Sequence, residues 1–299
     1  MQWSDLMSRP RPQASERIAY GADPNQFGDL WRPEGSGLHP LVVMIHGGCW
    51  EAATADLHIM DWAADDLRRR GYVVWNIEYR RIDQPGGGYP GTYEDVSTAL
   101  AAVRGTGAAR FGADLSRKVI LGHSAGGHLA LWAGHRAGAR LKGVVAIGAI
   151  TDLEGDTNTG CGVEGLPKMT GPQTADRPDV YADTSPYHMA APLHPVVLVT
   201  GSEDVTVPPS IARRYAARMA YGEHWSLTGL PPALVVTAGF DPLKDEGMDY
   251  ARALEGAGVK AQHMDFPTLI HDFYLLADVS PTVKEAINQT ADALKAGLA

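Results

Sequence analysis

The chain has 299 residues, of which 44% are hydrophobic, and a formal net charge of -9 at pH 7. This length and composition suffice for one sizeable core. The negative charge argues against a nucleic-acid partner, because phosphate binding needs clustered Lys and Arg. No apolar run is long enough to span a membrane, and residues 1–20 lack the basic start and apolar stretch of a secretory signal. We therefore expect a soluble cytoplasmic protein.

Short apolar runs alternate with amphipathic stretches along the whole chain. The apolar runs predict strands at 17–20, 27–31, 41–45, 72–77, 118–122, 144–147, 196–200, 234–237 and 262–266. Helical spacing predicts helices at 57–70, 129–137 and 283–298, and Thr92 is expected to cap a further helix that buries Val96 and Leu100. Such alternation predicts an α/β fold with a mostly parallel, doubly wound sheet of about eight strands. One domain is expected to span residues 1–299.

Two segments do not have the pattern of regular structure. Residues 83–91 are rich in Gly and Pro, and residues 151–194 form a long polar insertion dense in Gly, Pro, Thr and Asp. Both follow predicted strands at the carboxyl end of the sheet, where α/β proteins bind ligands. We expect both segments to form walls of the active-site mouth.

A Gly-His-Ser-Ala-Gly motif at 122–126 lies directly between a predicted strand and a predicted helix. A turn this tight forces a strained backbone on Ser124, and glycines on both sides let the chain double back. The motif predicts that Ser124 is an exposed nucleophile.

A His-Gly-Gly-Cys-Trp motif at 46–50 follows the strand at 41–45. Acyl transfer builds negative charge on a carbonyl oxygen, so the hydrogen-bond donors must be in place beforehand. The amides of Gly48, Cys49 and Ala125 are the expected oxyanion hole.

Residues 46–50, 75–81 and 122–127 together resemble the esterase/arylformamidase branch of the α/β-hydrolase superfamily. The resemblance covers residues 1–220. It implies the α/β-hydrolase fold and a serine hydrolase.

The serine needs a base, and the base needs a carboxylate that orients it. His271 is the expected base, because it follows the last predicted strand and precedes the final helix. Chain order in this fold is Ser, acid, His.

Two carboxylates compete for the role of the acid. Asp204 and Asp241 each follow an apolar strand, and each precedes a helix with a Tyr and an Arg, so the strand–acid–helix module occurs twice. One helix and one strand separate Asp241 from His271, whereas two of each separate Asp204 from it. Adjacent strand ends bring side chains within hydrogen-bond reach, so Asp241 is preferred and Asp204 is the alternative.

Residues 228–299 resemble the hormone-sensitive-lipase family of carboxylesterases, with His-Asp-Phe at 271–273 where that family has His-Gly-Phe. We therefore consider a chimeric origin, natural or constructed, as a hypothesis. That family normally carries a helical cap, but the residues before 41 contain no long amphipathic helix. We expect little or no cap and a rather open site.

The expected function is a carboxylic ester hydrolase that acts through an acyl-enzyme on short-chain or aryl esters. The alternatives are an arylformamidase or another amidase or peptidase with the same triad, and an inactive binding module. Metal and organic cofactors are not expected; the expected partner is a small ester, and a homodimer stays open. The residues considered for an acyl or aryl pocket, or alternatively for the core, are Trp50, Tyr79, Tyr89 and Tyr93. Pairing of Cys49 with Cys161 is left open.

Overall fold

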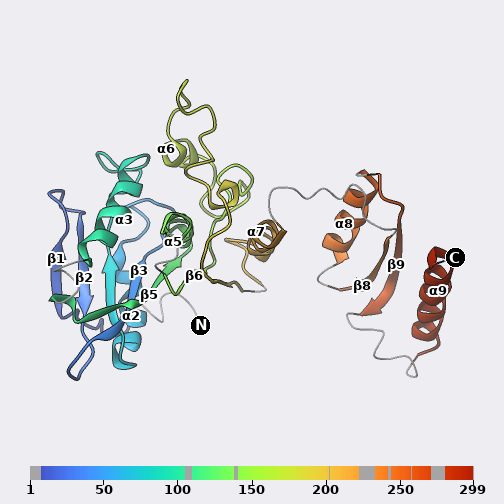
Figure 1. The fold of residues 1–299 in the computed structure, drawn as a ribbon, viewed down its shortest axis with the longest axis horizontal. Helices are drawn as coiled ribbons and strands as arrows, with labels where there is room; N and C mark the ends of the chain where they lie inside the picture. Colours follow the sequence, from blue (N-terminus) through green and yellow to red (C-terminus); the bar gives the residue numbers. More distant parts are fainter. Residues whose placement is uncertain are drawn as a thin grey trace. The chain divides into compact units, whose positions relative to one another are not determined.

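The computed structural model describes residues 8–104, 110–137, 141–201, 203–221, 233–241, 244–256, 258–270 and 280–298. The chain forms two compact units, residues 1–222 and residues 223–299, which are described separately (Figure 1). The expectation of one domain over 1–299 stays a prediction. In the described part of the chain, no helix combines the length and the apolar character that crossing a membrane requires.

The first unit is built on a seven-stranded sheet with the strand order β1-β2-β4-β3-β5-β6-β7. β1 and β2 pair antiparallel, as do β2 and β4, and all the other neighbours pair parallel. The strands are β1 (Glu16–Ala19), β2 (Phe27–Trp31), β3 (His39–Ile45), β4 (Val73–Ile77), β5 (Ala113–His123), β6 (Gly143–Ile147) and β7 (Val196–Val199). The expected mostly parallel α/β sheet is confirmed.

Helices cover both faces of this sheet, because its central strands are apolar on both sides. Along β3, Val43 and Ile45 belong to one buried cluster, and Val42 and Met44 belong to another. Successive side chains of a strand point to opposite faces, so each cluster is the core of one face. The longer described helices of the unit are α2 (Asp61–Arg69), α3 (Gly91–Ala102), α5 (Ala125–Arg136) and α7 (Pro209–Tyr221).

The helix expected at 57–70 is present as two pieces, the 3-10 helix η1 (Leu57–Met60) and α2. The expected cap of the next helix is wrong: α3 begins at Gly91, and Pro90 precedes it as the cap residue. The hydroxyl of Thr92 instead donates to the carbonyl of Arg80 and accepts from the amide of Gly88. This side chain therefore fixes the segment before the helix.

The insertion at 151–194 contains more regular structure than its composition indicated. It includes α6 (Leu166–Thr170) and the 3-10 helix η3 (Pro186–His188). The buried carboxylate of Asp156 accepts from the amides of Thr151 and Asp152 and holds the start of the insertion. The expectation of an irregular loop is thus only partly correct.

The register of the parallel strands brings four loops to one edge of the sheet. Ile45 of β3 pairs with Gly122 of β5, and His123 of β5 pairs with Ile147 of β6. Ile147 also pairs with Val199, the last residue of β7. The segments that follow these strands therefore leave the sheet at the same level.

The second unit contains a parallel strand pair, β8 (Ala233–Phe240) and β9 (Ala261–Ile270), connected by α8 (Lys244–Gly256). α9 (Pro281–Leu298) contacts both strands. Ala238, Leu269, Val283 and Ala286 form its buried cluster.

Candidate active site

Ser124 lies at the turn between β5 and α5 and has φ 54° and ψ -122°. This is a left-handed φ that residues with a side chain rarely adopt. Hydrogen bonds on both sides hold the strained turn. The Ser124 amide donates to the carbonyl of Ile147 at 2.7 Å, and the Ser124 carbonyl accepts from the amide of His128 at 3.1 Å.

The two glycines of the Gly-x-Ser-x-Gly motif are required by close backbone approaches. A Cβ at Gly126 would lie 2.2 Å from the carbonyl oxygen of Ile45, and a Cβ at Gly122 would lie 2.1 Å from the carbonyl oxygen of Gly126. Real Cβ atoms essentially never come this near to another atom. The first turn of α5 therefore packs directly on the end of β3.

The loop after β3 has three consecutive left-handed residues: Gly48 at φ 110°, Cys49 at 53° and Trp50 at 58°. Its neighbour Gly47 lies against the nucleophile, because a Cβ there would be 2.9 Å from Cβ of Ser124. In the described part of the chain, the amides of Gly48 and Cys49 have no hydrogen-bond acceptor. Two backbone donors beside a strained serine form the kind of site that stabilises an oxyanion.

A buried charged network underlies this loop. His46, Glu78 and Arg81 are at most 4% exposed. Nε2 of His46 lies 2.9 Å from a carboxylate oxygen of Glu78, and a guanidinium nitrogen of Arg81 lies 3.4 Å from the same oxygen. Arg81 also donates to the carbonyl of Ala55. Sequence analysis missed this network, although the signal was three charged residues at 78–81 directly after an apolar strand.

A disulfide joins Cys49 to Cys161, which settles the pairing that the sequence left open. It ties the loop after β3 to the insertion at 151–194. Disulfides are rare where thiols are kept reduced, so the bond weighs against the cytoplasmic location, which stays a prediction.

Asp204 follows β7 in the same unit as Ser124. Its Oδ1 accepts from the amides of Thr206 and Val207, each at 2.9 Å. A Cβ at Gly148, just beyond β6, would lie 3.4 Å from its Oδ2. Burial lowers the pKa of His123, and the nearby Asp204 carboxylate acts in the opposite direction. Asp204 therefore lies at the sheet edge from which the nucleophile projects.

Asp241 follows β8 in the second unit, and His271 lies outside the described residues. Phe240, the residue before Asp241, pairs with Ile270, the last residue of β9. The triad of Ser124, Asp241 and His271 stays a prediction.

A family model described as the alpha/beta hydrolase fold matches residues 42–275, which include the loop after β3 and the turn at Ser124. The chain belongs to this alpha/beta hydrolase family. The matched range includes residues 220–228, where the sequence suggested a junction between two hydrolase types. The chimeric origin stays an untested hypothesis, and similarity to one family covers both sides of that junction.

This hydrolase is similar to curated esterases. Carboxylesterase NlhH of Mycobacterium tuberculosis is 31% identical over 268 residues, which cover 90% of this chain and 77% of the relative. Esterase LipI of the same organism is 32% identical and covers 86% of this chain and 72% of the relative. Among solved structures, a thermostable esterase from Pseudomonas putida ECU1011 has 25% identity and a TM-score of 0.46, with 95% of this chain and 83% of that chain covered.

The aromatic residues that we considered for substrate binding in this hydrolase lie in different surroundings. Trp50 and Tyr79 are at most 1% exposed, and the hydroxyl of Tyr79 donates to the carbonyl of His46. Both are therefore core residues rather than pocket residues. Tyr89 and Tyr93 line a surface pocket of 320 Å³ together with Trp132. Tyr93 is itself 4% exposed and donates to the carbonyl of Met169.

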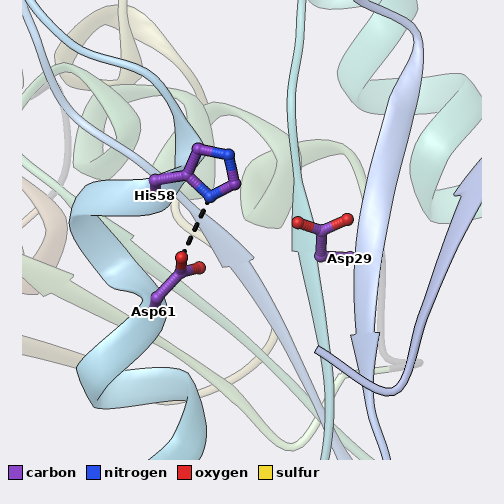
Figure 2. A group of neighbouring side chains, drawn as sticks. All are labelled: Asp29, His58 and Asp61. Atoms are coloured by element: carbon purple, nitrogen blue, oxygen red, sulfur yellow. Dashed lines mark hydrogen bonds and ion pairs between the residues drawn. The ribbon is translucent and has the colours of Figure 1, made fainter. Parts of the chain in front are cut away.

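A second polar cluster of the hydrolase combines Asp29, His58 and Asp61, whose ligand-type atoms lie within 4.8 Å of one another (Figure 2). His58 Nδ1 lies 2.9 Å from Oδ2 of Asp61. The guanidinium of Arg17 already donates to both oxygens of Asp29. Oδ1 of Asp61 is buried and has no hydrogen-bond partner in the described structure, and Asp61 lines a surface pocket together with Asp29 and His58. Arg17 and His58 therefore already bind the carboxylates of Asp29 and Asp61.

Proposed function

We propose that this chain, a carboxylesterase of the alpha/beta hydrolase family, hydrolyses short-chain or aryl esters through an acyl-enzyme on Ser124. The observation that carries the proposal is the strained Ser124 beside Gly47, with the amides of Gly48 and Cys49 on the same loop. Strained backbone and unused donors persist together only where the surrounding structure holds them.

In the proposed cycle, the hydroxyl of Ser124 attacks the acyl carbon and transfers its proton to His271. The amides of Gly48, Cys49 and Ala125 stabilise the oxyanion of the tetrahedral intermediate. His271 then gives the proton to the departing alcohol. A water molecule repeats the sequence and releases the carboxylic acid. No step of this cycle needs a metal or an organic cofactor.

Asp241 is the proposed acid that orients His271. The pairing of Phe240 with Ile270 supports this choice, because these two residues directly precede Asp241 and His271 in the sequence. The alternative acid, Asp204, is favoured by its place in the unit that holds Ser124 and by the position of its carboxylate near Gly148, just beyond β6.

The substrate is proposed to be a small ester. The pocket that Tyr89 and Tyr93 line includes no residue of 46–50 or 122–127, so their proposed contact with an aryl or short acyl group rests on the sequence alone. Trp50 and Tyr79 would act only by packing, because neither side chain is accessible. The other partner expectations, namely no nucleic acid, no membrane and an optional homodimer, stay predictions.

The test compares the natural chain with Ser124→Ala in two assays. A fluorophosphonate probe should label the natural chain and not the variant, and p-nitrophenyl acetate should be hydrolysed only by the natural chain. N-formylkynurenine, tested in parallel, identifies an amidase if it is the better substrate. Hydrolysis that persists in Ser124→Ala would contradict the proposal, and absence of both labelling and turnover would indicate an inactive binding module.

A further inference from the structure

The ring of His46 makes two hydrogen bonds at the start of the loop after β3. Its Nδ1 lies 2.7 Å from the carbonyl oxygen of Gly47, and its Nε2 lies 2.9 Å from Oε1 of Glu78. A carbonyl oxygen and an ionised carboxylate can only accept. Nδ1 therefore carries the hydrogen in the contact with Gly47, and the ring donates to that carbonyl.

Glu78 is ionised and rigidly held, so it can fix the orientation of this ring. Burial alone raises the pKa of Glu78, but His46 and Arg81 beside it bring the pKa below its ordinary value. Its carboxylate also accepts from the amides of Tyr79 at 2.9 Å and Leu57 at 3.2 Å. The ring of Tyr79 stacks on His46 with centroids 4.5 Å apart. Hydrogen bonds at its ring nitrogens and the stacked ring of Tyr79 thus hold the imidazole of His46 in place.

The bond from Nδ1 has a consequence for the next amide. The carbonyl of Gly47 and the N–H of Gly48 belong to one peptide plane and point in opposite directions. A glycine at φ 110° has no Cβ to restrict its rotation, so nothing within Gly48 itself prevents this plane from turning over. A donor that holds the Gly47 oxygen therefore fixes the direction of the Gly48 N–H, which directly follows the glycine that lies against Ser124.

We propose that His46 is a positioning residue for ester hydrolysis. Its Nδ1–H holds the carbonyl of Gly47 and thereby aims the Gly48 amide at the oxyanion, and Glu78 keeps the ring in place. His46 itself does not touch the substrate. The inference rests on the proposed function of the Gly48 amide.

Replacing His46 by Asn or by Gln tests its two hydrogen bonds one at a time, because each amide side chain can take the place of only one ring nitrogen. The amide nitrogen of Asn reaches the place of Nδ1, and that of Gln reaches the place of Nε2. His46→Asn therefore keeps the donor to Gly47, whereas His46→Gln keeps only the contact with Glu78. We expect His46→Gln to lower kcat for p-nitrophenyl acetate about 100-fold, the scale of one lost oxyanion donor, with KM within about twofold. His46→Asn should retain at least about tenfold more kcat than His46→Gln.

Thermal unfolding of both variants separates positioning from stability. Similar melting temperatures with different kcat values support the proposal, and equal kcat losses in both variants overturn it. Histidine labelled with ¹⁵N gives a readout that does not depend on activity. The His46 signals are those absent from the His46→Asn spectrum, and they should show hydrogen on Nδ1. A ring without hydrogen on Nδ1 overturns the proposal. Failure of the proposed function would appear separately, as turnover that survives Ser124→Ala.

Discussion

Three residues with side chains have a left-handed φ in the described part of the chain, and all three lie in the two candidate catalytic loops: Cys49, Trp50 and Ser124. Such a conformation costs on the order of 1–3 kcal/mol per residue. The sequence predicted the strain at Ser124, because glycines flank it at fixed spacing. It could not predict the strain at Cys49 and Trp50, because those residue types do not ordinarily adopt a left-handed φ.

Gly126→Ala should damage the site directly. The new methyl would collide with the carbonyl oxygens of Ile45 and His46, at 2.2 and 2.3 Å. Because backbone atoms cannot move aside cheaply, we expect a loss of about 1–3 kcal/mol in the free energy of unfolding and a fall in kcat. Urea unfolding and p-nitrophenyl acetate hydrolysis measure both.

The matched control is Gly256→Ala at the end of α8, where an added Cβ meets nothing within 4 Å. Because Ala has the higher helix propensity, this variant should be as stable as the natural chain or slightly more stable. Equal free energies of unfolding and equal kcat values in Gly126→Ala and Gly256→Ala would contradict the role of close packing at Gly126.

At the scale of elements, strands were predicted better than loops, because a buried parallel strand must be apolar on both faces. Residue type could not tell whether Tyr79 packs in the core or lines a pocket, since the same ring suits both. The Thr92 cap failed because the hydroxyl bonds to the preceding segment rather than to its own helix. Such long-range partners are not visible in local sequence.

Asp61, the first residue of α2, is expected to make the free energy of unfolding depend on pH. Burial raises the pKa of Asp61 to about 6, although His58 beside it lowers it. A carboxyl whose pKa is higher in the folded chain binds more protons when folded, so its contribution to stability falls as pH rises from about 4 to about 6. Asp61→Asn should remove this loss. Relative to the variant, the natural chain should lose free energy of unfolding between pH 4.5 and pH 7 in urea titrations. A constant difference between the two proteins would show that Asp61 does not titrate in this window.

The disulfide is the covalent link between the loop after β3 and the insertion, which are 112 residues apart in sequence. Because it restricts the unfolded chain, the Cys49→Ser, Cys161→Ser double variant should lose about 2–4 kcal/mol in the free energy of unfolding. Urea midpoints measure the loss, and the natural chain treated with a reductant should match the double variant. Two titratable thiols in the natural chain without reductant would contradict the pairing.

At the scale of the whole molecule, the sequence predicted two strand–acid–helix modules, and the structure contains both. One is β7, Asp204 and α7, and the other is β8, Asp241 and α8. The module pattern alone could not decide which acid serves, because each copy places a carboxylate directly after a strand. That choice depends on which strand end lies beside the base, a property of the assembled sheet rather than of either segment.

The choice of acid is tested by Asp241→Asn against Asp204→Asn. An orienting carboxylate holds the histidine in the tautomer that accepts the serine proton, and an amide cannot do this in the same way. We expect Asp241→Asn to lower kcat about 10⁴-fold while KM stays similar, because binding does not need the acid. Asp204→Asn should stay within about tenfold of the natural chain, since its carboxylate mainly accepts from the amides of Thr206 and Val207.

Equal melting temperatures would exclude misfolding as the cause. A large loss in Asp204→Asn alone would transfer the role to Asp204 and place the triad acid after β7.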